Sequence, residues 1–191
     1  MADDSQYLAK LRDYYARHRV LPSYASIGAL VGLRSKASVA GMVTRFKVEG
    51  LLESSPDRRL KPGRHFFDRP VSGNVRAGAP SAAVEVGHDS ISIDEHLIRH
   101  PSRTMLVTVK GDSMIDVGIF QGDVVVVEKG AAANIGAIVI AMLDNEFTLK
   151  RLDREKGRVV LRPENTAYPV IRLKGSDEII GVVVGLFRKY R

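Results

Sequence analysis

The second half of the chain consists of short apolar runs separated by turns, and this pattern restricts its fold more than any other feature. The runs occupy residues 106–109, 123–127, 137–141, 146–149, 159–161 and 179–184. Each has the length of a strand, and glycine or asparagine turns separate them, as in β-sandwiches and barrels. No apolar run approaches the roughly 20 residues that span a bilayer. We therefore expect a compact, mostly antiparallel β domain and no membrane segment.

Helical spacing replaces this pattern in the N-terminal third. The first helix is expected around residues 6–15, where one face carries Tyr7, Leu8, Leu11, Tyr14 and Tyr15. Ser23 is a favourable N-cap for a helix over 24–31, and Gly32 can end it in the left-handed conformation. Ser35 is a plausible N-cap for a third helix over about 36–49, which Gly50 closes. The buried face of that helix is predicted to be Val39, Met42, Val43 and Phe46.

The short turn 32–34 between the last two helices predicts a helix-turn-helix. The second helix would then be the recognition helix, with its N-terminal residues nearest the base edges. A stretch rich in proline, glycine and arginine follows at 54–64, which predicts a two-stranded wing. The alternative is a small helical interaction domain with a basic loop. Predicted DNA-contacting residues are Ser35, Lys36, Ala37, Ser38, Ala40, Gly41 and Arg45 in the helix and Arg58 and Arg59 in the wing, where Lys61 and Arg64 can also touch phosphates.

The charge distribution agrees with DNA binding by the N-terminal third. Of the net charge of +7, residues 1–68 contribute 12 lysines and arginines against 7 acidic residues. Residues 69–191 contain 17 against 15. A basic surplus of this kind attracts a phosphate backbone, although a solvated basic face has the same composition.

Cysteine content and the N-terminus predict a cytoplasmic protein. With zero cysteines, disulfides and cysteine-ligated metals are excluded, which fits a reducing compartment. No basic start followed by an apolar core is visible, so we expect no signal peptide. The turn-adjacent carboxylates Asp112, Asp116 and Asp123 repeat no ligand pattern, so neither a metal site nor a cofactor is expected.

A linker joins the two parts. Pro70, Gly73, Gly78 and Pro80 break regular structure, and most residues of 77–83 are small. The fold class is therefore α+β, with a winged helix-turn-helix domain over 1–68, a linker over 69–80 and a β-rich domain over 81–191. A passive hinge is the commonest role for such a linker.

Ser113 and Lys150 are the candidates for catalysis in the β-rich part. A serine nucleophile needs a nearby base, but the five histidines lie in unremarkable settings and no Gly-x-Ser-x-Gly elbow is present. A serine–lysine pair remains possible. A lysine that acts as a base near neutral pH needs a pKa about three units below its usual 10.4, at a cost of roughly 4 kcal/mol. Apolar neighbours make burial plausible, whereas a turn serine and a lysine facing water are the structural alternatives.

Four segments together closely resemble the LexA-type self-cleaving repressors. Residues 73–80, read Gly-Asn-Val-Arg-Ala-Gly-Ala-Pro, resemble the cleavage region, and 109–114, read Val-Lys-Gly-Asp-Ser-Met, resemble the nucleophile segment. Residues 148–152 resemble the segment of the general base, and 163–165 match the Pro-Glu-Asn turn that follows it. The 37 positions from Ser113 to Lys150 also fit.

The resemblance implies a role for each of these residues. Ser113 would be the nucleophile, Lys150 the neutral base and Ala77–Gly78 the scissile bond, with backbone amides around Ser113 forming the oxyanion hole. It also implies a homodimer formed by the C-terminal domain, operator DNA bound by the winged helix, and cleavage stimulated by the RecA–single-stranded DNA filament after damage. The chain would thus be a serine endopeptidase acting mainly on itself, and a repressor of the SOS response.

The recognition helix departs from the better-known members of that family. It carries Ala37, Ala40 and Gly41 where they have an asparagine and acidic residues. Two other functions remain open at this point. One is a DNA-binding repressor whose C-terminal domain is inert or binds peptides, and the other is a processing peptidase that acts on other chains. The winged-helix pattern and the lack of a membrane segment argue against the second.

Overall fold

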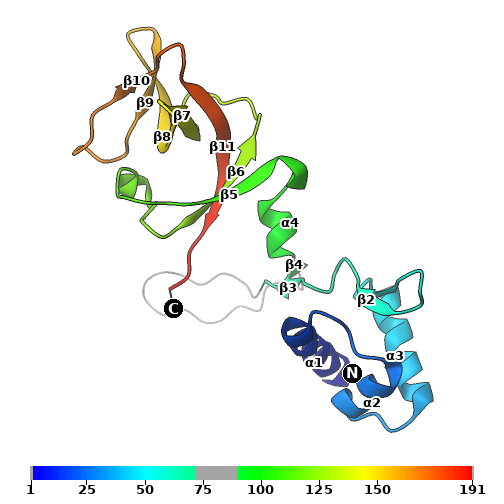
Figure 1. Cartoon of the computed structure of the whole chain (residues 1–191). Helices are drawn as coiled ribbons and strands as arrows, with labels where there is room; N and C mark the ends of the chain where they lie inside the picture. Colours follow the sequence, from blue (N-terminus) through cyan, green and yellow to red (C-terminus); the bar gives the residue numbers. More distant parts are fainter. Residues whose placement is uncertain (1, 72–89, 191) are drawn as a thin grey trace. The chain divides into compact units, whose positions relative to one another are not determined.

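The computed structural model describes residues 2–71 and 90–190 of the chain. It divides into two compact units, Met1–Ile93 and Asp94–Arg191 (Figure 1). The predicted cleavage bond, Ala77–Gly78, lies outside the described residues. The ranges 1–68, 69–80 and 81–191, given above for the DNA-binding domain, the linker and the β-rich domain, remain a prediction. None of the described helices is long and apolar enough to cross a membrane.

Helices and a small wing make up the N-terminal unit. The helices are α1 (Ala2–His18), α2 (Tyr24–Val31) and α3 (Lys36–Val48). Strands β1 (Leu52–Ser54) and β2 (Leu60–Pro62) pair antiparallel and form the predicted wing. Ser23 and Ser35 cap α2 and α3, because each side chain accepts a hydrogen bond from the backbone N–H three residues later. The winged helix-turn-helix prediction is therefore confirmed.

One apolar core joins these helices to the base of the wing. The predicted stripe of α3 is buried in it, and Leu11 of α1 and Ile27 of α2 pack on the same core. Leu52 of β1 and Phe66 close it from the wing side. The burial of one face of each helix in this core stabilises the three helices.

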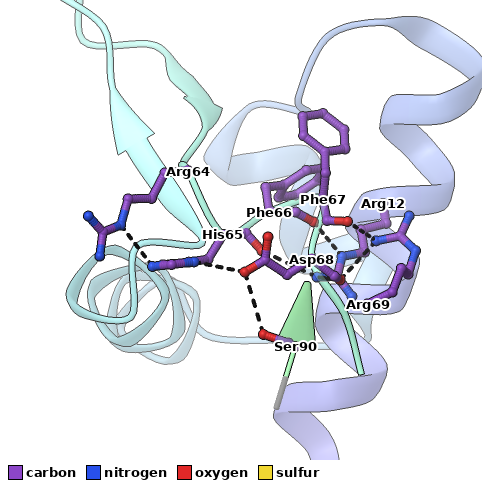
Figure 2. Close-up of polar contacts among 8 residues, drawn as sticks. All are labelled: Arg12, Arg64, His65, Phe66, Phe67, Asp68, Arg69 and Ser90. Carbon is purple, nitrogen blue, oxygen red and sulfur yellow. Dashed lines mark hydrogen bonds and ion pairs between the residues drawn. The ribbon is translucent and has the colours of Figure 1, made fainter. Parts of the chain in front are cut away.

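Arg12 of α1 fixes the chain where it leaves this core. Its guanidinium donates to the carbonyl of Phe66 at 2.6 Å and to the carbonyl of Asp68 at 2.9 Å (Figure 2). The Asp68 carboxylate in turn lies 2.8 Å from Nδ1 of His65 and accepts from the Ser90 hydroxyl at 3.5 Å. Next to this cluster, strand β3 (Arg69–Pro70) pairs antiparallel with β4 (Ser90–Ile91). The described residues 69–70 and 90–91 are thus paired with each other within the N-terminal unit.

The C-terminal unit contains, in its described residues, one seven-stranded antiparallel sheet with the order β10-β9-β8-β7-β11-β6-β5 (Figure 1). A short helix α4 (Ile93–Leu97) and the 3₁₀ turn η1 (Pro101–Arg103) precede it. The strands are β5 (Thr104–Thr108), β6 (Val124–Lys129), β7 (Ile138–Leu143), β8 (Glu146–Glu155), β9 (Arg158–Arg162), β10 (Ile171–Arg172) and β11 (Glu178–Phe187). The expected mostly antiparallel β domain and the α+β class are confirmed.

The central strands of this sheet are apolar because both of their faces are covered. On β7, Ile140 belongs to one core cluster with Val125 and Val127 of β6. Its neighbours Val139 and Ala141 belong to a second cluster on the opposite face. Since successive side chains of a strand point to opposite faces, a strand buried on both sides reads as a continuous apolar run.

A candidate active site and nucleic-acid interface

Ser113 lies in the turn between β5 and the short 3₁₀ helix η2 (Ile115–Val117). The turn begins at Gly111, whose φ of +81° lies in the left-handed region that favours glycine. It is anchored by Met114, which is only 1% exposed and packs in the first core cluster. The serine is therefore presented at the end of an ordered strand by a turn with one buried side chain.

Lys150 lies in the middle of β8 and is only 7% exposed. Its ladder partner on β7 is the fully buried Val139. Burial lowers the pKa of the Lys150 ammonium, because the charged form loses water and no carboxylate among the described residues pairs with it. The sequence pattern alone left open a lysine facing water, and the structure buries the side chain instead.

The two side chains meet. Lys150 Nζ lies 2.9 Å from Ser113 Oγ, 3.0 Å from Thr148 Oγ1 and 2.9 Å from the carbonyl oxygen of Leu149. An ammonium group has three N–H donors for these three acceptors. In the neutral amine, two N–H groups can stay on Thr148 and Leu149, and the lone pair then faces the Ser113 hydroxyl. This geometry suits a base that removes the serine proton.

A cavity of about 220 Å³ opens beside this pair. Its walls come from β5 and β8 and from the core, and its lining includes Val107, Lys110, Ile140, Phe147 and Leu149 besides Ser113 and Lys150. Phe147 is 66% exposed at this site although it is large and apolar. A cavity with both apolar and polar lining residues can hold an extended peptide segment against the serine.

Sequence reasoning did not find three residues that contact Lys150, the Ser113 turn or the segment that follows this turn. Thr148 accepts from Lys150, and its place two residues before the lysine on one strand was the only signal. Tyr168 donates to the Asp112 carboxylate, and this hydrogen bond raises the pKa of the Tyr168 phenol. Arg188 binds Asp123 from 65 positions away. No local pattern in the sequence indicates the last two contacts.

The predicted DNA-contacting residues are all exposed. Ser35 and Ser38 lie at the start of α3, where their hydroxyl oxygens are 2.8 Å apart. Arg45 is occupied within the unit, since its guanidinium makes two hydrogen bonds to the Asp4 carboxylate at 2.8 and 2.7 Å. This pair also lowers the pKa of Asp4.

The wing adds positive charge beside a groove. Arg58 lies in the wing turn with a φ of +62°, and Arg59 pairs with Asp57 at 3.2 Å. A groove of about 670 Å³ runs between the turn after α1 and the wing, and its lining includes Arg19, Arg58, Arg59 and Lys61. Such a basic groove suits a phosphate backbone.

Comparisons with known proteins show the family of the chain. Residues 70–184 match the family described as Peptidase S24-like. The chain is 35% identical to the LexA repressor of Clostridium acetobutylicum over 88% of this chain and 86% of the relative. It is 38% identical to the LexA repressor of Clostridium tetani over 88% of each chain. It is 35% identical to that of Shouchella clausii over 96% of this chain and 94% of the relative. The chain therefore belongs to the LexA repressor family of SOS repressors and carries the self-cleaving, peptidase S24-like domain of that family.

Proposed function

We propose that this chain binds operator DNA as a homodimer and ends its own repression by cutting the Ala77–Gly78 bond with Ser113 and Lys150. The observation that carries the proposal is the distance of 2.9 Å between Lys150 Nζ and Ser113 Oγ, with the lysine buried. A lysine with only a structural role on a strand gains nothing from burial against a turn serine. A lysine that acts as a base must be neutral, and burial favours the neutral amine.

The chemistry follows from the pair. Neutral Lys150 takes the proton of the Ser113 hydroxyl while Oγ forms a bond to the carbonyl carbon of Ala77. Backbone N–H groups around Ser113 stabilise the oxyanion that forms. The C–N bond to Gly78 then breaks, and the Lys150 ammonium returns the proton to the leaving amine. Water, deprotonated by the same lysine, then attacks the ester carbonyl carbon. The bond to Ser113 Oγ breaks, Oγ takes the proton back from the lysine, and Ala77 leaves as a carboxylic acid that ionises in water.

The consequence for DNA binding is a loss of avidity. The two recognition helices of a dimer engage two half-sites, so binding of the second is intramolecular and gains effective concentration. Cleavage at Ala77–Gly78 separates the winged helix from the dimerising domain, and each winged helix then binds alone. The exposed start of α3, the basic wing and the surplus of 5 positive charges in residues 1–68 support DNA binding by this part.

The proposal is tested by following cleavage and DNA binding in one sample. Purified protein bound to a labelled operator is incubated with RecA, single-stranded DNA and ATP, and both chain length and DNA mobility are recorded. We expect the chain to be cut and the DNA to be released together. Ser113→Ala and Lys150→Ala should each keep the DNA bound and the chain intact. An intact wild-type chain under these conditions would instead indicate a repressor with an inert or peptide-binding C-terminal domain.

A further inference from the structure

The turn that carries Ser113 is held from outside by a second segment of the same unit, residues 163–168, which we call the clamp. The backbone N–H of Glu164 donates to the carbonyl of Ser113 at 2.8 Å. The carbonyl of Glu164 accepts from the N–H of Asp116 at 2.9 Å. One residue of the clamp therefore bonds to the chain on both sides of Met114, directly beside the serine.

Two further clamp residues hold Asp112, the residue before Ser113. Asn165 Nδ2 donates to the Asp112 carbonyl at 3.1 Å. The Tyr168 hydroxyl donates to the Asp112 carboxylate. Together with the two backbone bonds of Glu164, these contacts fix the whole turn from Asp112 to Asp116.

The clamp also forms an ion pair with β8, the strand that contains Lys150. Arg151 follows Lys150 on β8, and its Nε donates to a carboxylate oxygen of Glu164. The same guanidinium donates through Nη1 to the carbonyl of Gly136 at 2.5 Å, which limits its freedom. The side chains of Arg151 and Glu164 are only 29% and 22% exposed, so water screens their attraction incompletely.

From these contacts we infer that Glu164 is a positioning residue for self-cleavage, which fixes the Ser113 hydroxyl against Lys150 through its ion pair with Arg151. This inference rests on the proposed function of Ser113 and Lys150. The serine and the base belong to segments 37 residues apart in the sequence, and one hydrogen bond between their side chains joins them directly. The route from Arg151 through Glu164 to the Ser113 carbonyl supplies a second connection that does not involve the reacting atoms.

Positioning of this kind has a specific kinetic consequence. A misplacement of about 1 Å in a catalytic pair can lower a rate on the order of 100-fold. Burial lowers the pKa of Lys150, and the residues that line the cavity around Lys150 do not include a residue of the clamp. Loss of the ion pair should therefore lower the rate reached when Lys150 is neutral and leave the midpoint of the pH profile in place.

The experiment measures two quantities on the full chain. One is the rate of self-cleavage as a function of pH. The other is the rate at which a small serine-directed phosphonofluoridate labels Ser113, followed by intact mass, because this probe does not depend on docking of the cleavage segment. All rates are taken well below the Tm of each variant, so that loss of folded protein does not contribute.

Four substitutions separate positioning from a general structural role. Glu164→Ala should lower both rates by at least about tenfold, with an unchanged pH midpoint. Glu164→Gln keeps an oxygen that can accept from Arg151 and should restore most of both rates. The double variant of Arg151→Ala and Glu164→Ala should be cut and labelled no more slowly than the slower of the two single variants, because the two residues act as a unit. Asp153→Ala is the control, since its carboxylate on β8 pairs with Arg162 of β9, and its described side-chain contacts do not include the Ser113 turn.

The outcomes distinguish the inference from the function on which it rests. Wild-type protein that is neither cut nor labelled contradicts the assignment of Ser113 and Lys150, and the inference fails with it. If the wild-type protein is cut and labelled, and Glu164→Ala is labelled at the wild-type rate, the inference is overturned and the assignment of Ser113 and Lys150 stands. Equal losses in Asp153→Ala and Glu164→Ala would also overturn it, because any ion pair of β8 would then have the same effect. If Glu164→Ala does not fold, the comparison of Arg151→Lys with wild type decides, with a partial loss of labelling expected and no loss contradicting the inference.

Discussion

The buried position of Lys150 disfavours the charged form of its side chain. The side chain is 7% exposed, and its described hydrogen-bond partners are a serine hydroxyl, a threonine hydroxyl and a backbone carbonyl. These neutral acceptors stabilise an ammonium less than a carboxylate does, so desolvation lowers the pKa of the group. The neutral amine, which is the form that a base requires, is therefore more abundant at a given pH than for a lysine in water.

The first prediction concerns the pH dependence of self-cleavage. Below the pKa of Lys150, the neutral fraction rises about tenfold per pH unit, so the rate of self-cleavage should rise with the same slope. Because burial lowers this pKa, the midpoint of the rate profile should lie below the value of about 10.4 for a free lysine. The measurement is the first-order rate of chain cleavage at closely spaced pH values. A rate that falls with rising pH, or a midpoint near the histidine value of about 6.5, would contradict a lysine base.

Among the described residues of the C-terminal unit, Asp123 is the other buried charged residue, and it has a partner. The carboxylate is 1% exposed and accepts two hydrogen bonds from Arg188, at 2.5 and 2.6 Å, and one from the N–H of Phe120 at 2.8 Å. The hydrogen bonds from Arg188 lower the pKa of Asp123, and burial opposes this shift. Arg188 thus ties the end of β11 to the segment that follows the Ser113 turn.

The second prediction is a pH-dependent loss of stability in Arg188→Ala. At neutral pH the variant leaves a buried carboxylate without its cation, so its Tm should lie several degrees below that of the wild type. The stabilisation that comes from a lowered carboxyl pKa is present above the unfolded pKa of about 3.9 and is lost as the pH falls through the folded pKa. The Tm difference should therefore shrink toward acid pH. Calorimetry at several pH values measures it, and a difference that stays constant down to pH 2 would count against the ion pair.

At the scale of elements, the wing depends on a close approach of two backbones. Gly63 follows β2 and donates its N–H to the carbonyl of Leu51 at 2.9 Å. A Cβ at position 63 would lie 2.2 Å from the carbonyl oxygen of Gly50. Only glycine fits there, because the obstructing atoms belong to the backbone and not to the end of a flexible side chain.

The third prediction compares two glycine-to-alanine substitutions in the same unit. Gly63→Ala should lower the free energy of unfolding by about 2 kcal/mol, the usual cost of overpacking. Gly41→Ala lies on the exposed side of α3, where the nearest atom to a new Cβ is the end of Arg45 at 3.8 Å, and should raise it by about 0.5–1 kcal/mol. Thermal unfolding followed by the helical circular dichroism signal tests both. Equal effects of the two substitutions would show that the close approach at the wing is unimportant.

The elements that the sequence predicted are those with local causes. The N-caps Ser23 and Ser35, the left-handed Gly32 and the apolar face of α3 each depend on residues within one or two turns. The longer strands were also predictable, because continuous apolar runs are typical of strands covered on both faces. The two-residue strands β3, β4 and β10 carry no such signal and were not predicted.

The candidate site was predictable only in part, for the same reason. Ser113 and Lys150 were identified from a resemblance over several segments, and either residue alone favoured a structural reading. The contact of Arg188 with Asp123 joins residues 65 positions apart, and that of Tyr168 with Asp112 joins residues 56 apart. Such contacts depend on how the sheet folds and leave no periodic trace in the sequence.

At the scale of the whole molecule, the position of the proposed scissile bond in the sequence explains how its cleavage ends repression. Helix α3, whose exposed start is predicted to contact DNA, belongs to the unit Met1–Ile93. The serine–lysine pair belongs to the unit Asp94–Arg191. The Ala77–Gly78 bond follows every residue predicted to contact DNA and precedes the entire sheet. A single hydrolysis there separates DNA recognition from the unit that is expected to dimerise, so repression ends without any change in the recognition helix.

The most direct test of this account is the identity of the new chain end after cleavage. Purified wild-type protein is incubated at alkaline pH without RecA, and the fragments are analysed by intact mass and N-terminal sequencing, with Ser113→Ala treated in parallel. The account predicts the fragments 1–77 and 78–191, a new N-terminus at Gly78 and no fragments from Ser113→Ala. A chain that stays intact, a cut at another bond, or the same cut in Ser113→Ala would contradict it.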